Sequence, residues 1–355
     1  MSPSTPWLTL AVSRTSAAIS EYNDVLETLN LAPTAFPMFT LMIGKKTKSD
    51  TLGWLTEKPT RNSLPRLHGQ AYVHTDRSAR TDAPTIYVDY ELQSWDQIQP
   101  DEYTGGQVPL RHTIDLLARN DECWSRRRVG NMICGRGIAP LCDTICYFAM
   151  DLGGIKAVAA SLAEHIIQEP SSEVPHSAMP RVLVVVETVA RTFDPHTTEA
   201  RVLELTEDIW RKDINNAQES FTTRLRSHYY DVRVIGLNKR SKPRQRCVQL
   251  RKRLLCVKRE VHLARVAAGI RFKKEHMFAF ASKLIRSINP DSPSPFSFIT
   301  ASRPAGLHLE DLTKHIREVT SLIPSEIWLC HLVVPLLSSS IVLATYPPDS
   351  HRKFR

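Results

Sequence analysis

The residues of this chain whose types and spacing best suit chemistry lie at 39–52, in the sequence FTLMIGKKTKSDTL. An apolar run leads to Gly44, and a basic turn then leads to Lys48 and Ser49, where we predict that a helix begins. A phosphate-binding loop uses a strand, a glycine turn whose N–H groups surround the phosphates, a lysine for the β- and γ-phosphates, and a hydroxyl for Mg²⁺. We therefore predict a site for GTP or ATP with Mg²⁺, in which Gly44 shapes the loop, Lys48 contacts the phosphates and Ser49 binds the metal.

The same loop departs from the usual phosphate-binding pattern. Gly44 and Lys48 lie two residues closer together than that pattern requires, and Thr47 stands where a second glycine would let the backbone turn. An ordinary turn between a strand and a helix is therefore the alternative interpretation of this stretch.

A candidate carboxylate for the metal is Asp89, at the end of the run Thr85–Asp89. A polar turn without helical periodicity joins this run to Gln70–His74, and this spacing permits an antiparallel hairpin but no helical crossover. This order of elements resembles GTPase-like P-loop domains, in which a hairpin follows the loop and its second strand ends in an aspartate that reaches the Mg²⁺. The resemblance implies that role for Asp89. The alternative is a solvated aspartate that caps the following turn. A base-reading aspartate is missing from Glu187–Ala190, so no particular base is predicted.

The elements that must hold these groups are six short apolar or alternating runs, whose lengths and β-branched content are typical of strands. They are Phe39–Ile43, Gln70–His74, Thr85–Asp89, Thr144–Asp151, Arg181–Glu187 and Asp231–Leu237. Amphipathic helical patterns occur at Ile155–Ile166 and Glu199–Leu225, and beyond Leu237 the periodicity is helical only. We predict an α/β fold of the P-loop NTPase type, GTPase-like, with a mostly parallel sheet and one hairpin, followed by an all-helical domain.

Three parts of the chain are expected. Residues 1–32 form an extension with a loose start and one amphipathic helix from Ser16 onward, residues 33–237 form the α/β domain, and residues 238–355 form the helical domain. In the last part, Ile327–Tyr346 carries no charged residue over about the length that spans a bilayer. Its His331 and Pro335 favour a buried helix over a membrane helix.

The net charge of +9 is concentrated in one segment. Between Asn238 and His276, fourteen Lys and Arg oppose two Glu, an excess of +12, so the remainder of the chain is mildly acidic. A solvated helix face or an acidic partner is the favoured interpretation, with nucleic acid or an anionic membrane as alternatives. Only Phe272 is available there for stacking on bases, which argues against a platform for single strands.

Cysteine usage and the N-terminus indicate the compartment. Seven cysteines and no secretory signal pattern predict reduced thiols in the cytoplasm or the nucleus. Cys142 and Cys146 lack a second matched pair of zinc ligands, so we interpret them as buried structural thiols. His165, His228 and His262 are scattered without a matched nucleophile, so no hydrolase site is predicted.

Four stretches carry a resemblance to a known group of proteins. They are GRGIAPLCDTICYFAMDLGGIKAVAASLAEHI at 135–166, PRVLVVVE at 180–187, DSPSPFSFI at 291–299 and PSEIWLCHLVVPLLSSSIVLATYPP at 324–348. This set resembles the N-terminal GTPase-like and helical regions of large fungal multidomain proteins, which often precede a patatin-like phospholipase domain. The resemblance covers most of the chain from about residue 38. The resemblance implies a regulatory, nucleotide-sensing module with an effector domain or protein in trans as its partner. The chain ends where such a domain would begin, which predicts a standalone or truncated copy.

Three hypotheses of function follow. The leading one is a degenerate, GTPase-like nucleotide-binding regulatory module with weak or lost hydrolysis, because no residue that would position water is evident. No G-x-S-x-G motif of a phospholipase occurs, and no catalytic residue is predicted. The second hypothesis is a non-catalytic interaction scaffold that keeps the fold without the nucleotide. The third is an electrostatic binder of nucleic acid or anionic membrane through residues 238–276.

Overall fold

The fold is taken from a computed structural model in which two compact units can be distinguished, Met1–Phe296 and Ser297–Arg355. Residues 6–298 are described apart from 13–15, 23, 57–68, 77–80, 92–108, 116–125, 173, 189–192, 214–218 and 289–294. Beyond them only positions 301, 317–318, 321, 330–331, 334–335 and 338 are described. The apolar run Ile327–Tyr346 therefore lies mostly outside the described residues. Within the described part, no helix is long and apolar enough to cross a membrane.

The core of the first unit is a nine-stranded sheet with the strand order β6-β2-β1-β4-β5-β3-β7-β8-β9. Its strands are β1 (Leu8–Val12), β2 (Ser16–Glu21), β3 (Met38–Ile43), β4 (Gln70–Thr75), β5 (Thr85–Tyr90), β6 (Leu110–Asp115), β7 (Cys142–Phe148), β8 (Arg181–Thr188) and β9 (Val232–Asn238). Strands β5, β3, β7, β8 and β9 are parallel, whereas β4 pairs antiparallel with β5, as the predicted hairpin requires. The α/β class is thus confirmed.

The prediction of a mostly parallel sheet is wrong, because the other half of the sheet is antiparallel. Strand β1 pairs antiparallel with β2 and β4, and β2 pairs with β6. Within the stretch expected to be loose, Leu8–Val12 is therefore a strand, and Ser16–Glu21, where a helix was expected, is a strand as well. In β2 burial alternates residue by residue, with Ala17, Ile19 and Glu21 buried, the period of a strand. The helical spacing in the sequence arose because it ran across the end of β2 into the short helix α1 (Asp24–Glu27).

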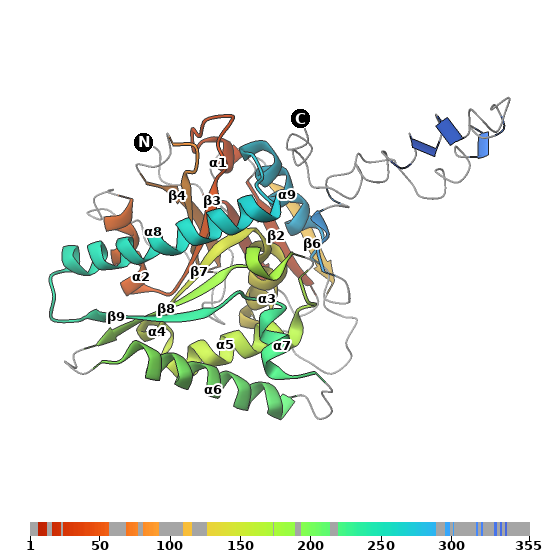
Figure 1. Ribbon diagram of the computed structural model, residues 1–355. Coiled ribbons are helices and arrows are strands. Elements are labelled where there is room, and N and C mark those ends of the chain that lie inside the picture. Colours follow the sequence, from red (N-terminus) through yellow and green to blue (C-terminus); the bar gives the residue numbers. More distant parts are fainter. Residues whose placement is uncertain are drawn as a thin grey trace. The chain divides into compact units, whose positions relative to one another are not determined.

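Helices cover both faces of the parallel half (Figure 1). They are α2 (Lys46–Leu55), α3 (Arg126–Met132), α4 (Ala149–Leu152), α5 (Ile155–Gln168), α6 (Pro195–Asp213), α7 (Phe221–Arg226), α8 (Pro243–Ala268) and α9 (Lys274–Arg286), with a π-helical turn at Ile133–Ile138 and 3₁₀ turns at Ala139–Leu141 and His176–Ala178. The predicted helix over Glu199–Leu225 is thus two helices. Helix α8 lies across one face, and α5 and α6 lie beyond the other (Figure 1).

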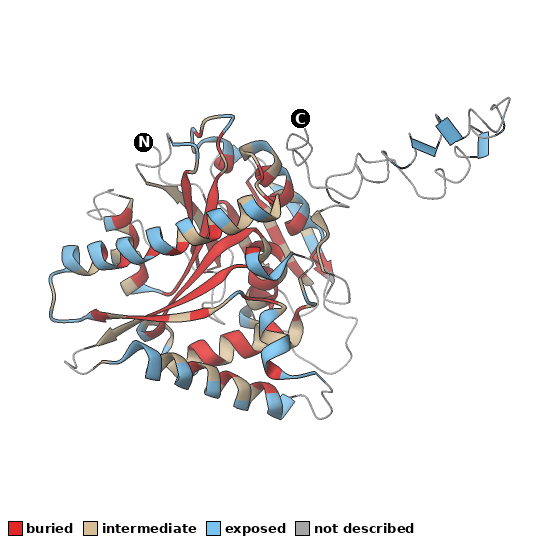
Figure 2. Cartoon of the chain, in the orientation of Figure 1, coloured by how far each residue is buried: buried red, intermediate tan, exposed pale blue. Residues whose placement is uncertain are grey.

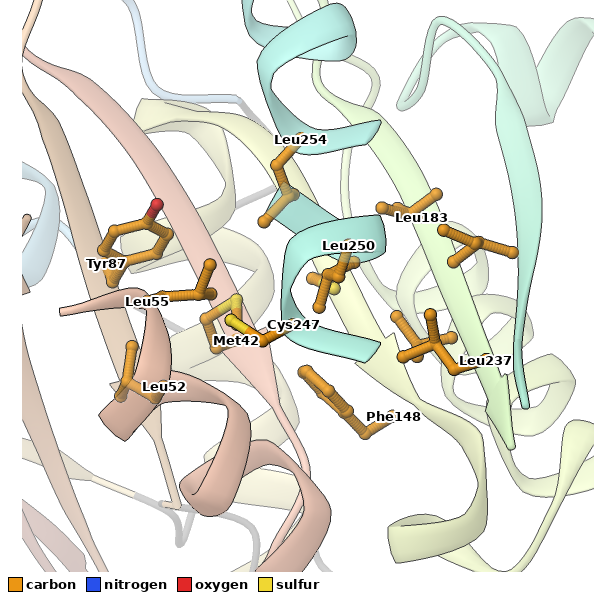
Figure 3. Packing of buried hydrophobic residues seen from close by; sticks show 13 residues of the cluster. Met42, Leu52, Leu55, Tyr87, Phe148, Leu183, Leu237, Cys247, Leu250 and Leu254 are labelled. Carbon is orange, nitrogen blue, oxygen red and sulfur yellow. The ribbon is translucent and has the colours of Figure 1, made fainter. Parts of the chain in front are cut away.

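The apolar layer between the sheet and helices α2 and α8 is shown in Figure 3. Leu52 and Leu55 of α2 and Leu250 of α8 pack against strand residues that are themselves almost fully buried, among them Met42 and Phe148. Helix α8 therefore belongs to the compact unit that contains the sheet. The domain boundary predicted at residue 238 therefore lies inside this unit, at the end of β9.

Burial follows this layering (Figure 2). Strand β3 lies between β5 and β7, and each of its six residues is buried, as expected for a central parallel strand. On the neighbouring strand β7, Cys142 and Cys146 are buried, as predicted, and both are free thiols. The carboxyl ends of β3, β5 and β7 meet at one edge of the sheet, and this edge carries the predicted site residues.

Candidate functional site

The loop after β3 does connect a strand to a helix, and Gly44 lies at its tightest point. A Cβ atom placed on Gly44 would lie 2.8 Å from Asp151 Oδ2 and 2.9 Å from Phe148 Cβ. Both distances are below ordinary van der Waals contact, so only glycine fits between β3 and the segment that follows β7. Gly44 thus shapes the loop, but what it makes room for is a side chain of the same protein.

The carboxylate of Asp151 occupies the N-terminus of α2. Its Oδ2 accepts hydrogen bonds from the N–H groups of Lys45 (2.8 Å) and Lys48 (2.9 Å), and its Oδ1 accepts one from Thr47 (3.0 Å). The first N–H groups of a helix have no partner within the helix and attract anions, an effect that the helix dipole strengthens. A phosphate group would use these donors in a nucleotide-binding loop. Here an internal carboxylate uses them.

The side chain of Lys48 is fully buried in an ion cluster beside β5. Its Nζ lies 2.6 Å from Asp89 Oδ1 and 2.9 Å from Glu91 Oε1, and it donates to the carbonyl oxygen of Tyr90 at 3.2 Å. His74 Nε2 lies 3.8 Å from the other oxygen of Asp89. Register accounts for this arrangement, because β3 and β5 pair in parallel and end together. Lys48 therefore neutralises carboxylates of the protein.

The four predicted site residues are thus placed unequally. Gly44, Lys48 and Asp89 come together at the carboxyl edge of β3 and β5, while Ser49 lies in the first turn of α2, partly exposed, with its N–H donating to the carbonyl oxygen of Lys45 at 2.9 Å. Sequence reasoning missed Asp151 and Glu91.

A signal for Glu91 was present, because residues two apart in an extended segment point to the same side. Glu91 should therefore lie on the same side as Asp89. In the sequence, Asp151 is only the last residue of the apolar run Thr144–Asp151. Nothing local ties it to a loop about a hundred residues earlier.

A triphosphate with Mg²⁺ does not fit these residues as they lie. The helix N–H groups already bind Asp151, and Lys48 is already neutralised. An incoming polyphosphate would meet the negative charges of Asp151, Asp89 and Glu91, and like charges at such short range repel. Among the described residues, no group of three or more His, Cys, Asp or Glu side chains is arranged to hold a metal ion.

No family model and no curated protein sequence matches this chain. The function must therefore be inferred from this geometry. The decisive feature of the site is that two groups suited to phosphate are already paired with carboxylates of the same chain. The N-terminus of α2 binds Asp151, and Lys48 binds Asp89.

A second polar cluster is buried between α5 and the segment before β9. The sequence analysis treated His165 and His228 as scattered, but their ring centroids lie 5.6 Å apart, and His165 Nδ1 is hydrogen-bonded to the hydroxyl of Tyr229. His228 Nε2 lies 3.1 Å from the carbonyl oxygen of Glu169, and Arg224 Nη2 donates to the same oxygen at 2.6 Å. These bonds satisfy the carboxyl end of α5, where carbonyl groups lack helical partners. The cluster is structural: it holds the end of α5 against residues 224–229, and we call it the clamp.

This clamp predicts a loss of stability in acid. Burial, and secondarily the charges of His228 and Arg224, lowers the pKa of His165 from its usual 6.5 to about 3. The folded chain therefore binds fewer protons than the unfolded chain between these values, so stability is present above pH 6.5 and is lost as the pH falls toward 3. As the pH falls through this range, we expect the free energy of unfolding to decline less steeply in His165→Gln than in the wild type, by up to about 1.4 kcal/mol per pH unit. Urea unfolding at several pH values measures this slope. The exposed His196→Gln variant is the control, and an identical slope in both variants would contradict the buried neutral imidazole.

Proposed function

We propose that this chain is a non-catalytic interaction scaffold, built on a GTPase-like P-loop fold whose phosphate site is filled by its own side chains. The observation that carries the proposal is the carboxylate of Asp151, which accepts three N–H hydrogen bonds at the start of α2. In this proposal the partner is another protein, either an effector domain or a protein in trans, and the chain does not require GTP, ATP or Mg²⁺.

The strand arrangement supports the ancestry in this proposal. The loop leaves the carboxyl end of the central strand β3, the hairpin β4–β5 follows it in sequence, and Asp89 stands near the end of β5. These are the relative positions of a GTPase-like phosphate loop and its metal-side aspartate. A fold can persist after its original chemistry is lost, because function depends on the site and not on the fold.

The ion cluster supports the loss of that chemistry. A phosphate-binding lysine must be available to its ligand, whereas the side chain of Lys48 is fully buried and lies on two carboxylates. To bind a nucleotide, the chain would have to expel Asp151 from three hydrogen bonds and separate Lys48 from its partners. Separation of a buried ion pair is strongly unfavourable. The paired arrangement is self-sufficient and gives the loop a rigid, ligand-independent shape.

We expect Mg²⁺-GTP and Mg²⁺-ATP to leave the thermal unfolding of the wild-type chain unchanged. A ligand present at about 100 times its dissociation constant would stabilise the folded state by about 2.7 kcal/mol, which differential scanning fluorimetry detects easily. The measurement should be made at millimolar nucleotide, with and without Mg²⁺, and with inorganic phosphate as a third ligand.

The variant Asp151→Ala provides the matched comparison, because it exposes the same N–H groups without altering Lys48. Stabilisation by nucleotide or phosphate in this variant alone would locate the block at Asp151 and support the proposal. Asp194→Ala serves as the control, since Asp194 caps the exposed start of α6 by accepting from the N–H groups of His196 and Thr197. A Mg²⁺-dependent stabilisation of the wild-type chain would contradict the proposal.

A further inference from the structure

The cations of helix α8 fall into two sets with different surroundings. Those facing the sheet are engaged in contacts within the chain. Arg251 donates to the carbonyl oxygen of Leu55 at 2.8 Å, Lys258 to Thr85 Oγ1 at 2.9 Å, and Arg265 lies 3.0 Å from the buried carboxylate of Asp143. Much of the positive charge noted in the sequence is thus structural.

The second set is exposed to solvent; Figure 2 shows that exposed residues recur along α8. Six exposed residues at spacings of three or four form one line along one side of the helix, and residues with such spacing share a helix face. They are Arg244, Val248, Lys252, Leu255, Arg259 and Leu263. We call this line the outer stripe. It alternates strictly between a cation and an aliphatic side chain.

The aliphatic residues of the outer stripe are large and highly exposed. Val248, Leu255 and Leu263 are 53%, 55% and 59% exposed, so each leaves more than half of its side chain in contact with water. The one acidic residue of α8, Glu260, lies off the stripe, and its carboxylate is 2.8 Å from Arg233. In the part of the chain that the structure describes, no carboxylate forms an ion pair with the cations of the stripe.

We propose that the outer stripe of α8 is a docking surface for an acidic amphipathic helix of a partner protein. A helix that places Glu or Asp opposite Arg244, Lys252 and Arg259, and aliphatic groups opposite the other three positions, would match the stripe in both charge and polarity. Opposite charges at e and g positions fix partner choice between paired helices in the same way. This inference rests on the proposed scaffold function, and it names the scaffold's surface and the chemistry of its partner.

The alternation argues against the two other anionic ligands. Nucleic acid offers phosphates to the cations but no counterpart for three exposed aliphatic groups, and the stripe contains no aromatic residue on which bases could stack. A helix lying in a membrane interface places its apolar residues on one face and its cations on another. In the outer stripe, Lys252 and Arg259 lie on the same line as Leu255, so the stripe has no separate apolar face of the kind such a helix inserts.

The test is fluorescence anisotropy of a labelled synthetic helical peptide, as long as α8, with Glu and Leu alternating along one face at the stripe's spacing. We expect the full chain to bind it saturably and the Lys252→Glu/Arg259→Glu double variant to bind at least about tenfold more weakly. Leu255→Ser should also weaken binding. The matched control is Lys156→Glu/Lys212→Glu, which makes the same change of charge at exposed positions of α5 and α6 and should bind as the wild type does.

Several outcomes would overturn this docking surface. They are the absence of peptide binding, equal weakening in the two double variants, equal binding of a peptide with Lys in place of Glu, or a preference for duplex DNA or phosphatidylserine vesicles through the same residues. The failure of the scaffold function is distinguishable from these. Stabilisation of the wild-type chain by Mg²⁺-nucleotide contradicts the scaffold, whereas lost peptide binding with inert nucleotides contradicts only the outer stripe.

Discussion

Replacement of Lys48 by alanine is expected to lower the free energy of unfolding by about 3–5 kcal/mol, the cost of removing one partner from a buried ion pair. The Lys48 ammonium group lies within 3 Å of the carboxylates of Asp89 and Glu91, and its side chain is fully buried. Without it, the burial of Asp89 loses the positive charge that compensates it. Urea unfolding at neutral pH measures the difference. In a working phosphate loop this substitution costs affinity for the ligand, whereas here it should cost stability.

Two further variants make this result specific. Lys46→Ala alters an exposed lysine at the start of the same helix and should change stability by no more than about 0.5 kcal/mol. Lys48→Met combined with Asp89→Asn and Glu91→Gln removes all three charges and should recover part of the loss, because no uncompensated charge is then buried. A loss in Lys48→Ala no larger than ~1 kcal/mol, as at a surface ion pair, would contradict the buried cluster.

The second large effect is expected at Leu250, in the layer between α8 and the sheet. Leu250→Ala should destabilise the whole sheet-containing unit by about 2–5 kcal/mol, from lost burial and the cavity left behind. The side chain is fully buried in the cluster that also contains Met42 and Phe148. Chemical unfolding followed by fluorescence and by circular dichroism should show a single transition at lower denaturant in the variant.

Leu255→Ala is the control for Leu250→Ala, because it makes the same substitution five residues further along the same helix, at a residue that is 55% exposed. It should leave the transition nearly unchanged. If Leu250→Ala instead produced a separate early transition while the sheet unfolded at the wild-type midpoint, α8 would belong to an independent domain. That outcome would support the boundary at residue 238 that the sequence indicated.

Local patterns predicted the parallel half of the sheet well. The runs that became β3, β5 and β7 are buried throughout, and those that became β8 and β9 are mostly buried. Such apolar runs are easily recognised in a sequence. The hairpin was predictable because the linker between β4 and β5 has no helical pattern. The proximity of Gly44, Lys48 and Asp89 was also predictable, because neighbouring parallel strands end at the same edge of the sheet.

The rest depended on contacts between distant segments. Asp151 reaches Lys48 across 103 positions, and no local pattern in the sequence distinguishes it from a helix cap. The antiparallel strands β2 and β6 are half exposed and contain polar residues, so their hydrophobic signal is weak. The boundary expected at residue 238 lies inside the first compact unit, because α8 packs on the sheet although it is basic. Four of its cations, Arg246, Arg251, Lys258 and Arg265, contact the sheet unit, and cations are usually expected on solvated faces.

The inward cations of α8 also bear on the order in which the chain acquires its structure. Arg251 binds the end of α2 across 196 positions, and Arg265 binds the start of β7 across 123. Lys258 donates to the carbonyl oxygen of Ala83, just before β5, across 175 positions. Contacts of such long separation form late, because the chain must first close the intervening loops. During synthesis, the part of the β3, β7 and β8 face that α8 covers thus stays open until residue 268 has emerged. The helix that completes this face is made only after all nine strands of the sheet.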